Sequence, residues 1–561
     1  MLTVAARRRL GLLIGVCCSL VLLFALYRRP LMSVEDVGAH ALGITGLHEP
    51  QSVDGFSYAY TQGDAGIRFP QVGVANFAVD LRMGGPQGSL PVTAQIVTPL
   101  QTLGMGTVER IRSYHLLLPA TQHGNLDFQL QSETRMVASD PRTLGLLLDW
   151  VRLRSIGATL PPVWGILSVP GLWLLLWLML HPFGGALVSI VKITLAWRLA
   201  LWMAGAAGLW FSRSLYSVGK AMTHHGRIAE RDEFVWNTFA GAWIQWDAVH
   251  YQTIALNGYS FAGERYPNIA FFPLYPLLIR FILPLTRGNL TLAPLIVSQL
   301  AFLVGLVMLS DLLKRDFSAS VAQRTLVLLL LFPTSLFFAA AYTESLAFAL
   351  VVAVLWALRR QNWWLAGAAG FFLALTRLPG VMMTPVLLVA YAQHCEWQWR
   401  KVGPSLLATL LPAWGLACFM LFQWRSFDTP LAFLIAQQSW ENRLSPPWVM
   451  PLVLLRAVSV GAEWPMAVFQ AATWMSFVGL MFVGLRHLPL VYGLTAVLML
   501  APAYLSNFPW SLPRHVLIGV PAFISMAVIA EEAWARRIIF GLFGSLLVIA
   551  VVLFVNSFWV A

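Results

Sequence analysis

The chain has 561 residues, of which 58% are hydrophobic, 13% aromatic and only 11% charged. Soluble domains carry about 25% charged residues, so this composition excludes a soluble globular protein, a collagen and a long disordered chain. The net charge is +12, and basic residues gather at the ends of apolar runs, as at Arg359 and Arg360. This is the positive-inside pattern of a protein with several membrane helices.

The first apolar run covers residues 10–27 and follows three arginines. A signal peptide would end in a small-residue cleavage site, whereas two arginines and a proline come next here. We therefore expect residues 1–30 to form an uncleaved anchor helix with its N-terminus in the cytoplasm.

Residues 31–160 have a different character, with alternating stretches such as Phe77–Leu81 and Leu126–Leu130 between Gly and Pro turns. Alternation with frequent turns is typical of an all-β sandwich. None of the four cysteines lies in this stretch, so no disulfide framework is expected there. We predict an extracytoplasmic β domain.

Residues 161–561 are almost wholly apolar runs. At about 20 residues per crossing, the whole chain would form roughly 11–13 transmembrane helices, with an external loop at residues 212–268. Some runs are too short to span alone, so we expect broken or paired helices around Pro333 and Pro379. The segment Phe271–Leu285 is either re-entrant, or the charge rule fails there.

The first candidate site lies in the segment Trp243–Ala255. On a helix, Asp247 shares a face with His250 and Tyr251, with Trp246 beside it. One carboxylate among aromatic rings suits activation of a hydroxyl group on a sugar. The same pattern also fits an amphipathic interfacial helix with a capping Asp, which spacing alone favours.

Other charged residues lie between apolar runs, where they are costly to retain and are functional candidates. Glu344 follows Tyr342 in such a position, either as a catalytic group or as the partner of a buried Arg or a helix N-terminus. Arg377 lies in a Pro- and Gly-containing turn, and Arg514 precedes His515. Either guanidinium could hold a lipid phosphate, or pair with Glu344 or with Asp247.

Four motifs occur in one order along the chain: Trp246-Asp247 with Gly258-Tyr259, Phe271-Phe272-Pro273 with Pro276, Tyr342-Thr343-Glu344-Ser345, and Thr376-Arg377 with Gly380. Together they resemble the PIG-V family, the second mannosyltransferase of glycosylphosphatidylinositol assembly, and its bacterial relatives. The resemblance covers roughly residues 190–530. A further segment, Asp140–Gly145, is similar to segments of β domains attached to prokaryotic membrane glycosyltransferases.

The resemblance implies a GT-C membrane glycosyltransferase, in a multi-pass protein of the plasma membrane if the source is prokaryotic. It would take a sugar, mannose first, from a polyprenyl-phosphate carrier and pass it to a hydroxyl of a glycan, glycolipid or protein on the extracytoplasmic face. The family's catalytic aspartate would map to Asp247, acting as general base with inversion. No metal, other cofactor or nucleic acid is expected.

The remaining candidates take supporting roles in this hypothesis. His250 and Glu344 are second-choice catalytic groups, to orient the acceptor or to pair with an Arg. Donor phosphate binding is assigned to Arg377, Arg514 and His515, and substrate binding to Trp243, Trp246, Tyr251 and Tyr342.

Two other classes of function fit parts of the sequence. A secondary transporter or lipid flippase would use the intramembrane Arg and Glu residues as a substrate path. We find no matching halves in the sequence, and the aromatic external loop favours chemistry at the membrane surface. The third class is a non-catalytic scaffold or glycan receptor, against which the retained Asp247 with its flanking aromatics weighs mildly.

Overall fold

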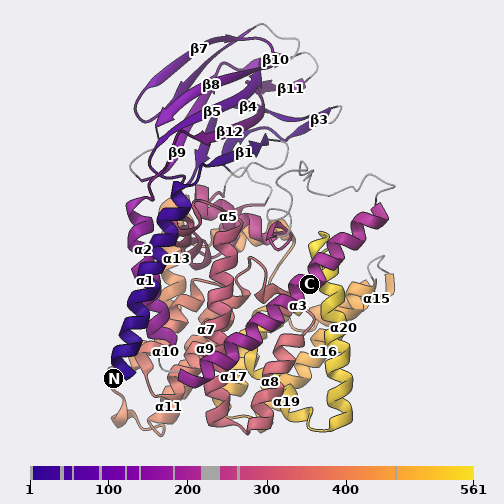
Figure 1. The fold of residues 1–561 in the computed structure, drawn as a ribbon. Helices are drawn as coiled ribbons and strands as arrows, with labels where there is room; N and C mark the ends of the chain where they lie inside the picture. Colours follow the sequence, from indigo (N-terminus) through magenta and orange to yellow (C-terminus); the bar gives the residue numbers. More distant parts are fainter. Residues whose placement is uncertain are drawn as a thin grey trace. The chain divides into compact units, whose positions relative to one another are not determined.

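The structure is a computed structural model that describes residues 4–37, 43–53, 56–86, 91–119, 123–137, 140–180, 184–216, 240–261, 266–460 and 464–561 (Figure 1). The chain divides into two compact units. Unit 1 contains the described residues of Met1–Leu178 and Ile279–Ala293, and unit 2 those of Met179–Gly219, Trp236–Leu278 and Pro294–Ala561.

Unit 1 begins with helix α1 (Val4–Arg28), at the position of the predicted anchor, and continues into strands. The predicted all-β domain is confirmed as a half-barrel. Its larger sheet has ten antiparallel strands, seven of them in the order β7-β6-β9-β4-β12-β5-β8, and a two-stranded sheet pairs β10 with β11. The strands are β1 (Met32–Asp36), β2 (Ile44–Leu47), β3 (Gln51–Val53), β4 (Phe56–Phe69), β5 (Asn76–Gly84), β6 (Val92–Val97), β7 (Thr102–Val108), β8 (Arg112–Pro119), β9 (Leu126–Ser132), β10 (Arg135–Val137), β11 (Asp140–Leu144) and β12 (Leu147–Ser155).

The alternation that predicted these strands reflects one buried face. Side chains point to opposite faces along a strand, and every second residue of β5 from Phe77 to Met83 is fully buried. Leu126, Phe128 and Leu130 of β9 belong to the same hydrophobic core. The pattern was therefore readable because one face of the sheet is apolar and the other is not.

The Asp140–Gly145 segment forms β11 and the turn after it. Asp140 accepts hydrogen bonds from Nε (2.9 Å), Nη2 (2.6 Å) and the backbone N–H (3.0 Å) of Arg142. These bonds hold the pKa of the Asp140 carboxyl down at about 2. At Gly145 a Cβ would lie 2.2 Å from the hydroxyl of Thr61, so only glycine allows this close approach. The segment thus has a structural role in unit 1.

Glu35 on β1 makes the stability of the β domain depend on pH. Burial raises the pKa of its carboxyl from 4.5 to about 7. The folded state therefore holds a proton that the unfolded state releases, so stability falls as pH rises through this window, by at most about 1.4 kcal/mol per pH unit. We expect the amides of β1 and β12 to exchange hydrogen faster at pH 7.5 than at pH 5 after correction for intrinsic rates.

The matched variant for this measurement is Glu35→Gln, which cannot titrate. In the full chain it should remove most of the pH dependence of protection in β1 and β12. Equal pH dependence in both proteins would contradict the assignment to Glu35.

A buried arginine joins the end of α1 to the rest of unit 1. The Nη1 atom of Arg287 donates to the carbonyl oxygens of Leu26 (3.2 Å) and Arg29 (2.8 Å), and its Nη2 donates to the Thr159 hydroxyl (2.8 Å). The last carbonyls of a helix lack partners within the helix and carry partial negative charge. Arg287 satisfies one of them, at Leu26, and α1 also packs against helix α2 (Val163–Leu180) and the 3-10 turn η4 (Leu283–Thr286) in one hydrophobic cluster.

Unit 2 is helical, which confirms the class predicted for this part of the chain. Its elements are α3 (Gly184–Tyr216), α5 (Asp247–Asn257), η3 (Asn268–Ala270), the start of α6 (Leu274–Ile282), α7 (Leu292–Asp316), α8 (Ala319–Leu331), η5 (Ser335–Phe338), α9 (Glu344–Arg359), α10 (Trp363–Ala374), η6 (Leu378–Met382), α11 (Met383–His394), η7 (Trp399–Lys401), α12 (Leu406–Thr409), α13 (Leu411–Phe427), α14 (Ala432–Gln437), η8 (Gln438–Trp440), α15 (Val449–Val460), α16 (Trp464–His487), α17 (Leu490–Tyr504), α18 (Leu512–His515), η9 (Val516–Ile518), α19 (Val520–Ile529) and α20 (Ala533–Val555).

Within the described ranges, four helices are long and apolar enough to cross a membrane, and a bent pair at residues 512–529 makes a possible fifth. Other apolar helices have 10–17 residues, shorter than one crossing. Two of the breaks lie at the predicted prolines, since α8 ends before Pro333 and Pro379 lies in η6. Of the predicted external loop 212–268, residues 217–239 and 262–265 lie outside the described residues.

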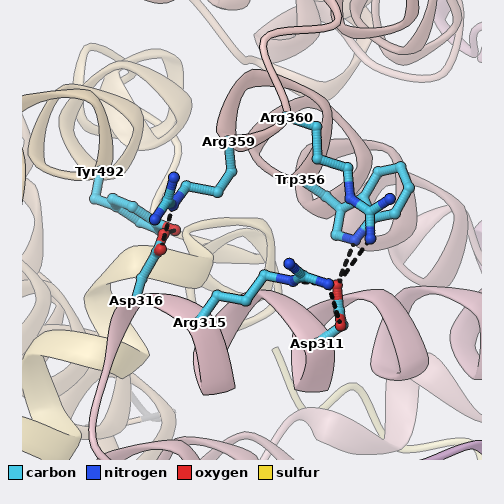
Figure 2. Close-up of polar contacts among 7 residues, drawn as sticks. All are labelled: Asp311, Arg315, Asp316, Trp356, Arg359, Arg360 and Tyr492. Atoms are coloured by element: carbon cyan, nitrogen blue, oxygen red, sulfur yellow. Dashed lines mark hydrogen bonds and ion pairs between the residues drawn. The ribbon is translucent and has the colours of Figure 1, made fainter.

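A charged network joins one end of α7 to α9 and α17 (Figure 2). Asp316 accepts from the Tyr492 hydroxyl (2.7 Å) and from Nε of Arg359 (2.5 Å). Asp311 accepts from Trp356 Nε1 (2.9 Å), and Arg315 pairs with it one helical turn away. The basic residues that marked a membrane boundary in the sequence are therefore ion-paired as well.

Candidate functional site

Four charged side chains from four separate segments of the sequence form one ion-paired chain in unit 2. Nη1 of Arg514 lies 2.6 Å from Oδ2 of Asp247, and its Nε lies 3.3 Å from Oε1 of Glu344. Nη1 of Arg377 lies 2.6 Å from the same Glu344 oxygen. The sequence left open whether each Arg pairs with a carboxylate, and the structure shows that both do.

Exposure differs along this chain. The side chains of Arg514 and Glu344 in its middle are 8% and 1% exposed, whereas Asp247 and Arg377 at its ends are 23% and 14% exposed. A reactant can therefore reach an end more easily than the middle. One accessible carboxylate and one accessible guanidinium flank two buried partners.

Asp247 is the first residue of α5, and the residue before it is strained. Trp246 has φ of 55° and ψ of −116°, and a positive φ is uncommon for a non-glycine residue and often occurs at functional sites. The N–H of Ala341 donates to the carbonyl of Trp243 (3.1 Å), and the Tyr342 hydroxyl donates to the carbonyl of Gln245 (2.8 Å). These two bonds bring the Asp247 and Glu344 motifs together.

Glu344 begins α9, so its carboxylate lies at the positive end of a helix dipole. The sequence offered a buried Arg or a helix N-terminus as its structural partner, and the structure contains both. The adjacent Ser345 hydroxyl donates to the carbonyl of Phe338 (2.8 Å), which fixes the turn before α9.

Arg377 precedes η6, in the turn that follows α10. The N–H of Leu274 donates to the carbonyl of Leu375 (2.9 Å), which connects the Pro273 motif to the Arg377 motif. At Gly380 a Cβ would lie 2.4 Å from backbone atoms of α10. Glycine therefore allows the chain after Arg377 to pack directly against this helix.

Arg514 lies in the short helix α18, after Ser511 with φ of 83°. The Thr334 hydroxyl donates to the carbonyl of Pro513 (2.5 Å). Three rings surround the guanidinium carbon, those of Tyr342 (5.2 Å), Trp559 (5.4 Å) and Phe337 (5.6 Å). Such cation–π contacts stabilise a buried cation.

The four aromatic residues predicted to bind substrate differ in exposure. Trp243 and Tyr342 are at most 1% exposed and Tyr251 is 6% exposed, and the Tyr251 hydroxyl lies 3.4 Å from that of Thr343. Trp246 is half-buried, with its ring 5.5 Å from that of Trp559. Trp246 is thus the one of the four with substantial surface for a ligand.

The two candidate histidines are close in sequence to Asp247 and Arg514. His515 is half-buried and follows Arg514 directly. His250, one turn after Asp247 on α5, stacks on Phe271 with ring centroids 4.6 Å apart. Trp440 stands nearly perpendicular to both rings. We call the group His250, Tyr266, Phe271 and Trp440 the aromatic corner.

Trp440 and Trp559 were missed by sequence reasoning. Each follows a helix as a single tryptophan in a chain that contains 24 of them, so no local pattern distinguishes them. Among the described residues, no group of three or more His, Cys, Asp or Glu side chains could hold a metal ion.

Comparison with known proteins agrees with the motif reading. Residues 221–397 match the family model described as mannosyltransferase (PIG-V). This segment holds Asp247, Glu344 and Arg377, and the resemblance to the family is confirmed there. The match covers less than half of the chain, and it supports a glycosyltransferase. A search of curated proteins finds no match.

Among solved structures, the chain is similar to ArnT from Cupriavidus metallidurans, crystallised with undecaprenyl phosphate bound. The sequence identity is 16% and the TM-score 0.38. The match covers 62% of this chain and 62% of that one, so this chain spans less than two thirds of ArnT.

Proposed function

We propose that this protein is a membrane glycosyltransferase that moves mannose from a polyprenyl-phosphate carrier to an acceptor hydroxyl, with inversion. The PIG-V match over residues 221–397 supports the reaction class. The resemblance to that family suggests the donor. The ion-paired chain Asp247–Arg514–Glu344–Arg377 is the observation that carries the proposal, because its two accessible ends have the charges that the two reactants require.

In the proposed mechanism Asp247 is the general base. Its carboxylate takes the proton of the acceptor hydroxyl, and the acceptor oxygen attacks the anomeric carbon of the donor. The bond from that carbon to the phosphate oxygen breaks, and its electron pair leaves with polyprenyl phosphate. Attack opposite the leaving group inverts the anomeric centre.

The two arginines stabilise the negative charge of the departing phosphate. Preorganised positive charge in a site that excludes water is the larger catalytic term in many enzymes. Arg377 meets the phosphate at the accessible end, with His515 beside it, and Arg514 holds Asp247 in position. Glu344 orients both guanidinium groups, while His250 and Trp246 contact the acceptor. The substrate site is supported by the buried rings of Trp243, Tyr251 and Tyr342.

The extracytoplasmic location of the site is supported by α9. Glu344 and Arg359 lie at opposite ends of this 16-residue helix, about 22 Å apart along its axis at 1.5 Å per residue. The Arg359 end also carries Arg315 and Arg360 (Figure 2). The positive-inside rule assigns that end to the cytoplasmic side, which supports the proposed extracytoplasmic position of Glu344.

Arg377→Ala tests the donor assignment. Loss of a guanidinium–phosphate contact removes about 1.5–3 kcal/mol, so we expect the KM for polyprenyl-phosphate mannose to rise by about tenfold or more. The measurement is transfer of labelled mannose from the purified donor into membrane vesicles that contain the full chain and their own acceptors.

The matched control is Arg400→Ala, which removes an exposed arginine in η7 and should leave the donor KM unchanged. An unaltered donor KM in Arg377→Ala would overturn the donor role of Arg377. Absence of any transfer by the wild-type protein would overturn the proposed function itself.

A further inference from the structure

The aromatic corner has a geometry suited to a ring-shaped ligand. The rings of His250 and Phe271 stack nearly face to face, at 17°, and together form one side of the corner. The Trp440 ring forms a second wall, at 74° to His250 and 84° to Phe271, with centroids 6.0 and 5.9 Å away. Tyr266 borders Trp440 at 5.4 Å and is 42% exposed. All four side chains retain exposed surface.

The corner lies beside the proposed base. His250 follows Asp247 by three residues on α5, so the two side chains share a face and lie about 4.5 Å apart along the helix axis. A pyranose ring is of similar width. A ring packed against the corner would therefore present a hydroxyl at the Asp247 carboxylate.

Rigid packing supports the corner from behind. Phe272, the neighbour of Phe271, is buried against Phe419 (5.0 Å) and Phe433 (5.5 Å) in one hydrophobic cluster. Phe271 and Trp440 pack against the same cluster and remain partly exposed. Little conformational entropy is left to lose at these rings when a ligand binds.

Hydrogen bonds also tie the Trp440 segment to the Arg514 segment. The N–H of Arg443 donates to the side-chain oxygen of Asn507 (2.7 Å), and the Asn507 N–H donates back to the Arg443 carbonyl (3.2 Å). The Ser506 hydroxyl donates to the side chain of Asn442 (2.7 Å). The segment after Trp440 is thus held against the segment that precedes Arg514.

We propose that the aromatic corner is the acceptor subsite, and that the acceptor is a carbohydrate whose pyranose ring packs on Phe271 and Trp440. This inference rests on the proposed function, and it selects a sugar from the acceptor classes left open above. Aromatic faces bind the apolar C–H face of a sugar ring, while His250, Tyr266 and the Trp440 indole supply polar groups at the edges. An extended peptide presenting Ser or Thr would not require two perpendicular aromatic walls.

The test is saturation-transfer NMR with methyl α-D-mannopyranoside as probe, on the full chain in nanodiscs. We expect saturation of the sugar ring protons in the wild type and a decrease of about fivefold in Trp440→Ala, the range of one aromatic contact. Trp440→Phe should keep part of the signal. Trp448→Ala is the matched control, because Trp448 is a 65% exposed tryptophan eight residues farther along the chain.

Sugar binding tests this inference, whereas mannose transfer tests the proposed function, so the two can fail separately. Equal saturation in wild type and Trp440→Ala, or no saturation in the wild type, would overturn the subsite whether or not mannose is transferred. Loss of saturation in Trp440→Ala alone supports the subsite, even if transfer from polyprenyl-phosphate mannose fails and the proposed reaction falls. Where transfer occurs, Trp440→Ala should raise the acceptor concentration needed for half-maximal rate and leave the donor KM unchanged.

Discussion

Asp247→Asn is expected to lower mannose transfer by about 10²- to 10⁴-fold, the usual contribution of a general base. The amide cannot take the acceptor proton, yet its oxygen can still accept the 2.6 Å bond from Arg514. The donor KM should therefore change little while kcat falls. Initial rates at varied polyprenyl-phosphate mannose concentrations, in membrane vesicles, measure both quantities.

Asp428→Asn is the matched control for this substitution. Asp428 ends α13 with φ of 55° and is exposed, and asparagine tolerates the left-handed conformation at least as well as aspartate. This variant should transfer mannose at the wild-type rate. A folded Asp247→Asn protein with wild-type kcat would remove Asp247 from the role of base.

Glu344→Gln is expected to cost about 3–5 kcal/mol of stability, as for loss of one partner in a buried ion pair. The side chain is 1% exposed and contacts two guanidinium groups. Among the described residues, loss of this charge would leave Arg377 without its ion-pair partner and Arg514 paired with Asp247 alone. Chemical denaturation in detergent, followed by near-UV circular dichroism, measures the loss.

A second substitution distinguishes charge imbalance from altered packing. In the Glu344→Gln background, Arg377→Gln removes the excess positive charge and should recover part of the lost stability. The surface control is Glu396→Gln, in which a 67% exposed carboxylate paired with Lys401 loses its charge; exposed pairs contribute about 0–1 kcal/mol. If Glu344→Gln and Glu396→Gln unfold alike, the buried network does not stabilise the fold.

The sequence predicted the class of each part of the fold because the spacing of apolar residues depends on which faces of an element are buried. Period-two alternation marked β5 and β9, whose inner faces are buried, and long apolar runs marked the helices of unit 2. It also identified all four members of the ion-paired chain, because charged residues between apolar runs are rare. The predicted break at Pro333 is present for a local reason, the lack of an N–H donor in proline.

Pairing within the site was beyond sequence reasoning. Asp247 and Arg514 are 267 residues apart, and no local rule selects one Arg for a given carboxylate. The positive φ of Trp246 and Ser511 also has no signal in their residue types, since tertiary contacts impose it. Trp440 and Trp559 are positioned by contacts with residues that are distant in the sequence.

The joints between the motifs, meaning the hydrogen bonds that connect one motif to another, are made largely by backbone peptide groups. The bonds from Ala341 to Trp243 and from Leu274 to Leu375 use backbone N–H and carbonyl atoms alone. Exchange of side chains at these positions therefore leaves the joints intact, with proline at a donor position as the exception. Related chains can therefore differ in the side chains around the reaction centre while the backbone geometry of the site is kept. A proline at Ala341 or Leu274 would be the change that evolution must avoid.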